Sequence, residues 1–208
     1  MPTGRPREFD TERALELATS LFWQKGYEGT SLSDLTETLG ITRPSLYAAF
    51  GNKAALFMEA VAHYESTYWA APWRMLDEEP DLRRALERFL GEAAAILSCR
   101  EVPCGCMVVL STANVSAEAQ DVRDAMMALR KLGRANFLKR LERGRAEGAL
   151  PPDTDVEALA GAFTAVLQGM SVQARDGAPR AELERIARAS LAMLDVSCAP
   201  ARPGAAGR

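Results

Sequence analysis

Apolar residues recur at helical spacing along most of the chain. In residues 10–26 the apolar positions lie three or four apart and form a single stripe, and the same spacing returns in later segments. No segment alternates apolar and polar residues over the length of a strand; the nearest candidate is residues 107–110. Alanine, leucine, arginine and glutamate, which favour helices, dominate instead. The pattern therefore predicts an all-α protein.

Capping residues divide the beginning of the chain into three short helices. Asp10 is a suitable N-cap for the first helix, and Gly26 is expected to end it. Ser31 opens a capping box at the start of the second helix, which is expected to end at Gly40. The third helix follows after a single residue and is capped by Thr42. Two short helices joined by such a tight turn are typical of a helix-turn-helix.

Longer helical segments follow, separated by prolines and glycines. The first of them begins near Asn52 and is expected to stop before Pro72. The last ten residues contain too little apolar surface to pack and are expected to form a disordered tail. The predicted segments are residues 53–69, 82–98, 106–113, 117–147, 155–175 and 180–196.

The overall charge gives no support to nucleic-acid binding. The 208 residues carry a formal net charge of −3, and residues 1–53 hold six basic against seven acidic side chains. Only the placement of the basic residues can favour DNA, and residues 1–7 do contain two arginines and no acid. Apolar residues make up 48% of the chain, which is ordinary for a globular protein able to bury a core.

A helix-turn-helix reads DNA by placing the N-terminal residues of its second helix against base edges in the major groove. Arg43 can donate two hydrogen bonds to guanine, and Lys53 can reach a phosphate. Arg5 and Arg7 suit a flexible arm that enters the adjacent minor groove. A helix pair of this kind is also common as a purely structural element. The other candidate DNA contacts in and before the second helix of the motif are Thr42, Pro44, Ser45 and Tyr47.

The residues 30–57, TSLSDLTETLGITRPSLYAAFGNKAALF, resemble the signature of the TetR family in order and spacing. The resemblance covers about residues 5–60 and is loose beyond them. It implies DNA contacts at the residues named above, with Ser33 and Thr30 as weaker candidates. Ala49 stands where many members have histidine, which removes a phosphate contact, and Ala54 stands where many have glutamate. The resemblance also implies a head over residues 1–53, a larger ligand-sensing and dimerising helical domain over 54–198, and a tail over 199–208.

The larger domain offers candidates for a dimer interface and a sensing pocket. Two adjacent apolar helix faces can pair with their copies as a four-helix interface, or they can complete the subunit's own core. The interface candidates are Phe163, Val166, Met170, Leu183, Ile186, Leu191 and Leu194. Aromatic and methionine side chains can line a pocket, or they can simply be core. The pocket candidates are Tyr64, Tyr68, Trp69, Trp73, Phe89, Met107, Met126, Met127 and Phe137.

The cysteines form a second candidate sensing site. Cys99 on one side and Cys104 with Cys106 on the other flank a proline-containing turn, and a helix N-terminus near Cys106 would lower its pKa and raise its reactivity. The stretch GCMVVLSTANVSAEAQDVRDAM resembles the subgroup of N-ethylmaleimide-sensing repressors, which implies that Cys106 is the reactive residue. The alternative is an inert buried thiol. The spacing of Cys99, Cys104 and Cys106 does not suit zinc, so we expect neither a metal nor another cofactor.

These observations favour a repressor that binds a palindromic operator as a homodimer. A small molecule or a modified cysteine would release the operator. An activator, or a helical ligand-binding protein with a vestigial head, is the alternative. Nucleophile-elbow, dinucleotide-binding, phosphate-loop and zinc-protease motifs are missing, and the one histidine is His63, so we expect no enzyme. The chain shows neither a secretory signal nor an apolar run long enough to span a membrane, so we expect a cytoplasmic protein with reduced thiols.

Overall fold

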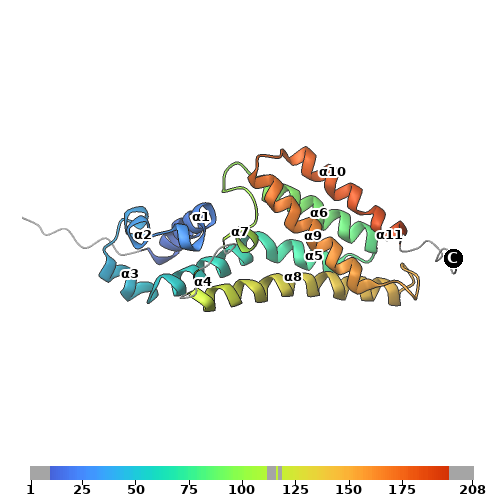
Figure 1. The fold of residues 1–208 in the computed structure, drawn as a ribbon, viewed down its shortest axis with the longest axis horizontal. Helices are drawn as coiled ribbons and strands as arrows, with labels where there is room; N and C mark the ends of the chain where they lie inside the picture. The colour runs from blue at the N-terminus through green and yellow to red at the C-terminus, as the bar shows by residue number, and fades with distance from the viewer. Residues whose placement is uncertain (1–9, 112–115, 117–118, 197–208) are drawn as a thin grey trace, which may run out of the picture.

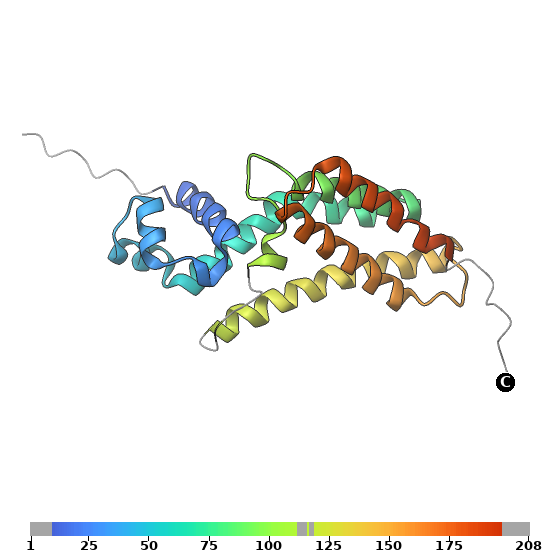
Figure 2. The same ribbon diagram turned by 45° about the horizontal axis from the view of Figure 1, so that its top comes forward.

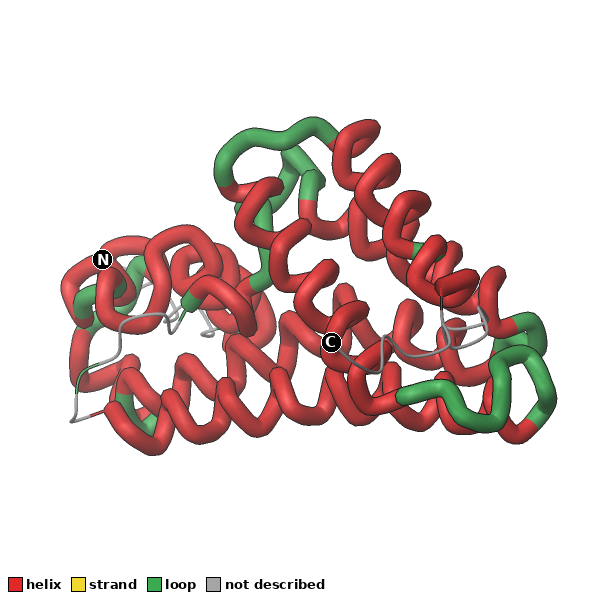
Figure 3. Tube along the Cα trace, turned by 45° about the vertical axis from the view of Figure 1, so that its right-hand side comes forward, coloured by secondary structure: helices red, strands yellow, loops and turns green. Residues whose placement is uncertain are grey.

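The computed structural model describes residues 10–111, 116 and 119–196, and every regular element in these residues is a helix (Figures 1 and 3). The predicted all-α class is therefore confirmed. The arm with Arg5 and Arg7 and the tail over residues 199–208 lie outside the described residues.

The first three helices form a small head at one end of the molecule (Figure 1). They are α1 (Thr11–Gly29), α2 (Leu32–Leu39) and α3 (Arg43–Phe50). Capping fixes their ends as predicted: Asp10 accepts a hydrogen bond from Arg13 N at 3.0 Å, and Ser31 and Asp34 form both bonds of a capping box. Gly40 takes the left-handed conformation, with φ 65°, that lets the chain turn sharply between α2 and α3.

The helix that begins at Thr11 is interrupted at Gly26, as predicted. The backbone leaves helical geometry there, with φ 76° and ψ 173°, and a further short helical turn then runs to Gly29. The extra turn, which the sequence did not predict, brings Tyr27 against the larger domain, where its N–H donates to the carbonyl of Ser111 at 3.1 Å. The label α1 therefore covers two helical pieces that meet at a kink at Gly26.

The fourth helical segment does not stop before Pro72, so this prediction was wrong. Instead α4 (Lys53–Tyr64), a π-helical turn η1 (Glu65–Trp69) and α5 (Ala70–Glu78) follow one another without a loop from the head into the larger domain (Figure 1). Pro72 falls in the first turn of α5, where a missing N–H costs least. The wider turn before it, closed by the hydrogen bond from Ala70 N to the Glu65 carbonyl, lets the chain continue.

The larger domain packs the remaining helices around the continuous segment α4–η1–α5, which we call the rod. They are α6 (Leu82–Leu97), α7 (Met107–Leu110), α8 (Gln120–Ala146), α9 (Val156–Arg175), α10 (Arg180–Ser190) and α11 (Ala192–Val196). Helix α5 packs on α6, α8 on α9, and α10 on both α6 and α9 (Figure 2). A chain of aromatic rings, Trp73, Phe89, Phe137 and Phe163, lies in the centre of this domain. The last predicted segment is divided at Leu191 into α10 and α11.

Trp23 of α1 joins the head to the larger domain. Its ring is 1% exposed and meets the rings of Tyr64 and Tyr68 edge-on, with centroids 4.7 and 5.2 Å away. Its indole N–H donates to the carbonyl of Gly105 at 2.8 Å, and its own carbonyl accepts from the guanidinium of Arg175 at 2.8 Å. One residue therefore touches α4 and η1, the loop before α7 and the end of α9.

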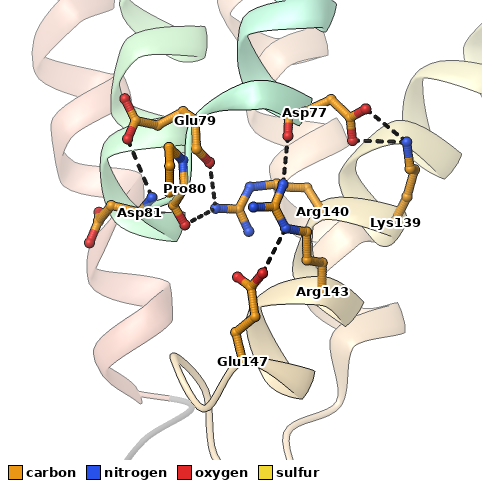
Figure 4. A network of polar contacts seen from close by, with 8 residues as sticks. All are labelled: Asp77, Glu79, Pro80, Asp81, Lys139, Arg140, Arg143 and Glu147. Carbon is orange, nitrogen blue, oxygen red and sulfur yellow. Dashed lines mark hydrogen bonds and ion pairs between the residues drawn. The ribbon is translucent and has the colours of Figure 1, made fainter.

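Arg140 holds α8 against the turn between α5 and α6 (Figure 4). It is 1% exposed, and its Nη2 donates to the carbonyls of Glu79 and Pro80, both at 2.9 Å. Arg143 adds a bond to the Asp77 carbonyl at 2.7 Å, one turn further along α8. Burial lowers the pKa of Arg140, because the charged form loses hydration that two carbonyls replace only in part.

Replacing this buried guanidinium should destabilise the protein far more than replacing an exposed one. We expect Arg140→Ala to lower the free energy of unfolding by about 3 kcal/mol, since it leaves two carbonyls without their donor and opens a void. The matched control Arg84→Ala removes an arginine whose side chain is 64% exposed, and it should cost under about 1 kcal/mol. Urea unfolding followed by circular dichroism measures both, and equal losses would contradict the proposed clamp.

Candidate DNA-binding surface and sensing cavity

The N-terminal half of α3 presents a polar face to solvent, while Leu46 and Phe50 fix its other side in the core of the head. Arg43 is the only charged residue in α3, so the acidic balance of the head does not fall on this helix. Every residue predicted to read DNA from this helix and its cap is exposed: Thr42, Arg43, Pro44, Ser45 and Tyr47.

Hydrogen bonds pre-arrange these exposed side chains. The hydroxyl of Thr42 accepts from Ser45 N at 3.3 Å and lies 2.9 Å from the Ser45 hydroxyl, so part of its capacity is used in capping α3. The guanidinium of Arg43 donates to the hydroxyl of Ser33 in α2 at 3.1 Å. Ser33, which was predicted as a weaker candidate for DNA contact, therefore lies beside Arg43, the main candidate for base contact.

Lys53 and Thr30, the remaining described candidates for DNA contact, differ in their positions. Lys53 begins α4 beside the cap Asn52, and its Nζ lies 4.3 Å from the centre of the Tyr27 ring. Partial burial lowers its pKa. Thr30 is fully buried, and its hydroxyl donates to the carbonyl of Gly26 at 2.7 Å. The prediction that Thr30 contacts DNA was therefore wrong, because its side chain is inside the head.

A cavity of about 90 Å³ lies between η1, α7, α8 and α9 in the larger domain. Four of the predicted sensing residues line it: Trp69, Trp73, Phe137 and Cys106. Phe89 and Met107 are fully buried in the core, and Met127 is 41% exposed on α8, so these three were wrong as pocket residues. The lining combines aromatic with polar side chains: Trp69, Trp73, Phe137, Glu65, Cys106 and Arg130.

The environment of Cys106 is the reverse of the predicted one. The helix that begins after it, α7, has only four residues, and the thiol is 8% exposed. Burial raises the pKa of Cys106, although a hydrogen bond with the Tyr64 hydroxyl acts in the opposite direction. The effect of desolvation on the pKa of Cys106 therefore outweighs any effect of the short helix. Cys104 lies outside the cavity and donates to the carbonyl of Cys99 at 3.6 Å.

Glu65 is a cavity residue that the sequence analysis missed. Burial raises the pKa of its carboxyl to about 7, and no hydrogen bond or ion pair joins it to the described residues. The available signal was its position four residues before Trp69, which puts an acid on an otherwise apolar helix face. A half-buried acid without a partner, lining the same cavity as a thiol, is typical of a functional site.

The backbone around Cys106 connects the cavity to the head. Its N–H donates to the hydroxyl of Ser171 in α9 at 2.8 Å, and the next N–H, of Met107, donates to the Tyr64 hydroxyl at 3.3 Å. The residue before it, Gly105, accepts the bond from Trp23. Gly105 has φ 83°, and an added Cβ would lie 2.8 Å from the Ser171 carbonyl oxygen. The segment is therefore closely packed between α1 and α9.

The predicted dimer interface is only partly at the surface. Val166 and Ile186 are half-buried and available for contact. Phe163, Met170 and Leu183 are fully buried, and Leu191 and Leu194 are 6% and 4% exposed, so these five complete the subunit's own core rather than face a partner. A shallow apolar groove beside them, between α9 and the α10–α11 segment, is lined by Ala158, Leu159, Ala162, Ala189, Ala192 and Met193.

Two searches of the described residues bear on other classes of site. Within residues 10–111, 116 and 119–196, no helix is long and apolar enough to cross a membrane. The same residues contain no group of three or more histidine, cysteine, aspartate or glutamate side chains able to hold a metal ion.

Comparison with known families matches both halves of the chain. Residues 14–60 match the family of bacterial regulatory proteins called tetR, and residues 82–190 match the tetracyclin repressor-like C-terminal domain. The chain belongs to the TetR family. Among curated TetR-type relatives, the repressor ComR of Escherichia coli K12 is 34% identical over 90% of this chain and 90% of its own length. The repressor BdcR of the same organism is 32% identical over 84% of this chain and 83% of its own length.

Solved structures of TetR regulators share the whole fold. A cysteine mutant of the regulator CifR, complexed with a 26-bp double-strand operator DNA, has 44% identity and a TM-score of 0.86, covering 90% of this chain and 98% of that one. Reduced NemR of E. coli has 26% identity and a TM-score of 0.72, covering 93% of this chain and all of that one.

The unpaired carboxyl of Glu65 should make stability depend on pH. Its pKa rises from 4.5 to about 7 on folding, so between these values the unfolded chain releases a proton that the folded chain keeps. Stability should fall by about 3 kcal/mol as pH rises through this window and then level off. Glu65→Gln should lack this fall, and the exposed control Glu59→Gln should keep it. Urea unfolding at pH 5 and pH 8 measures the difference, and parallel curves for Glu65→Gln and wild type would contradict the assignment.

Proposed function

We propose that the protein is a dimeric transcriptional repressor that reads a palindromic operator through α3. A ligand in the cavity, or modification of Cys106, would release the operator. The observation that carries the proposal is the exposed N-terminal half of α3, with Arg43 and Tyr47 outward and Leu46 and Phe50 buried. ComR and BdcR are named repressors, and the CifR structure contains operator DNA, which supports the same role here.

The release mechanism follows from the contacts between the cavity and α1. Two recognition helices fit half-sites one turn apart, about 34–36 Å, only at one separation. A group that fills the cavity presses on Cys106, and Gly105 beside it holds Trp23 of the head. A ligand that prefers the displaced arrangement shifts the population away from the DNA-binding state.

The groove between α9 and the α10–α11 segment is our candidate for the dimer contact. Its lining includes four alanines, Ala158, Ala162, Ala189 and Ala192, which let helices approach closely, and Val166 and Ile186 add apolar surface. Dimerisation raises operator affinity because the second head binds at high effective concentration. We assign residues 1–53 to DNA binding and 54–198 to sensing and dimerisation, place the protein in the cytoplasm and assign it no catalytic activity.

Selection from sheared genomic DNA at about 150 mM salt tests the DNA-binding role, since non-specific binding is weak at that salt concentration. We expect a palindromic site to be enriched. Arg43→Ala should lose about 1–3 kcal/mol of discrimination at one base pair, whereas Lys53→Ala should weaken binding to all sequences and reduce the salt slope by about one. The exposed Arg180→Ala, in the larger domain, is the control that should bind normally. An activator would show an operator upstream of the promoter rather than over it.

Alkylation tests the role of Cys106 in release. N-ethylmaleimide should release wild-type protein from the selected operator, and Cys106→Ser should stay bound because it lacks the thiol. Cys104→Ser, outside the cavity, is the matched control and should respond like wild type. Unchanged operator binding after mass spectrometry has confirmed modification of Cys106 would exclude this route and leave release to a non-covalent ligand.

A further inference from the structure

Two side chains with chemistry to offer line the same small cavity: Cys106 and Glu65. Glu65 is the first residue of the π-helical turn, and Cys106 comes from the segment before α7. Trp69, the last residue of the same turn, is 2% exposed, and its indole interacts with the Tyr64 hydroxyl. It therefore forms an aromatic wall of the cavity beside the two reactive groups.

The thiol of Cys106 must lose its proton before it can act as a nucleophile. Burial keeps the neutral thiol dominant at neutral pH, because its pKa is raised. The reaction therefore needs a neighbouring group that accepts the proton. The Tyr64 hydroxyl cannot accept it, because burial raises the pKa of Tyr64 well above the ordinary value, and the hydroxyl therefore stays protonated at neutral pH. Arg130 is a cation, and its Nη1 donates to the Val108 carbonyl at 2.9 Å.

The carboxyl of Glu65 meets this requirement. No hydrogen bond or ion pair to a described residue occupies it, and a carboxylate with a pKa of about 7 is present in quantity at neutral pH and still basic enough to take a proton. Two other ionisable residues, Cys106 and Arg130 from α8, line the cavity with it, and Tyr64, which precedes it in the chain, forms a hydrogen bond with Cys106. Helix α9 contributes only the neutral side chains Thr164 and Gln168 to the lining.

We propose that Glu65 accepts the Cys106 proton when the thiol adds to a small electrophile whose carbonyl is conjugated to a carbon–carbon double bond. The proposal rests on the role of Cys106 proposed above. Sulfur forms a bond to the alkene carbon β to the carbonyl, and the π electrons of the double bond move through the α carbon onto the carbonyl oxygen as an enolate. The proton held by Glu65 then passes to the other alkene carbon, so the addition is complete without an oxidant.

The test measures the rate at which N-ethylmaleimide modifies the Cys106 peptide in the full chain, by mass spectrometry after quenching and digestion. We expect Glu65→Gln to react at least tenfold more slowly than wild type at pH 7.5. The wild-type rate should rise around pH 7, and the rate of Glu65→Gln only above pH 9. Glu65→Asp should recover part of the rate, and the exposed Glu59→Gln should match wild type.

If Glu65 acted only through its charge, Glu65→Gln would change the alkylation rate in the opposite direction. The charge of Glu65 raises the pKa of Cys106, so its removal without any loss of base would favour the thiolate and speed the reaction. A faster or unchanged rate in folded Glu65→Gln overturns the proposal, and so does a wild-type Cys106 that does not react. Operator binding is measured separately. If Glu65→Gln is alkylated slowly but the alkylated wild-type protein still binds the operator, the role of Glu65 is supported and release by alkylation is rejected.

Discussion

The position of the head depends on the burial of Trp23. Its ring, packed edge-on against Tyr64 and Tyr68, is held by the body of the rod, while its N–H is held by the carbonyl of Gly105. Because the indole N–H is buried, losing that carbonyl would leave a donor unsatisfied at a cost of about 1–3 kcal/mol. The head and the segment before α7 are therefore linked directly through Trp23 and Gly105. Because Gly105 precedes Cys106 in the chain, this bond is the route by which we expect a change at Cys106 to reach α1.

The π-helical turn solves two problems at one place in the chain. It lets the rod pass Pro72, which lacks an N–H, and it sets Glu65 and Trp69 along one wall of the cavity. Both residues belong to the same continuous segment as α4, which starts at the head beside Lys53. The wall of the cavity and the support of the recognition helix are thus parts of one continuous segment.

Local chemistry explains which parts of the fold the sequence predicted. The caps at Asp10, Ser31 and Thr42 and the left-handed turn at Gly40 depend only on residues three or four positions away, and all were predicted. The exposed face of α3 was predicted for the same reason. A helical period shows that a residue is apolar and inward, but not whether it faces its own core or a partner. For this reason the sequence could not show that Phe163 and Met170 belong to the subunit's own core.

The wrong or missing predictions at the site concern residues whose environment is set by neighbours distant in sequence. Thr30 looked available because its burial comes from the fold of α1, and the kink at Gly26 supplies its acceptor. The thiol of Cys106 looked activated because only the helix after it is visible in the sequence, while the desolvating walls come from η1, α8 and α9. Glu65 could be noticed as an acid on an apolar face, but not placed next to a thiol some 40 residues away.

A thiol kept neutral by burial has a functional advantage over an exposed thiolate. Oxidants react with the thiolate form, so a raised pKa protects Cys106 from general oxidation. We expect selectivity to come from the cavity, which is small and whose lining includes both Cys106 and Glu65. The same arrangement makes the fold less stable as pH rises, because the half-buried carboxyl of Glu65 is harder to ionise in the folded chain than in the unfolded one. A raised pKa therefore has opposite consequences at this site: it costs stability above pH 7, and it leaves a carboxylate basic enough to accept a proton from the neighbouring thiol.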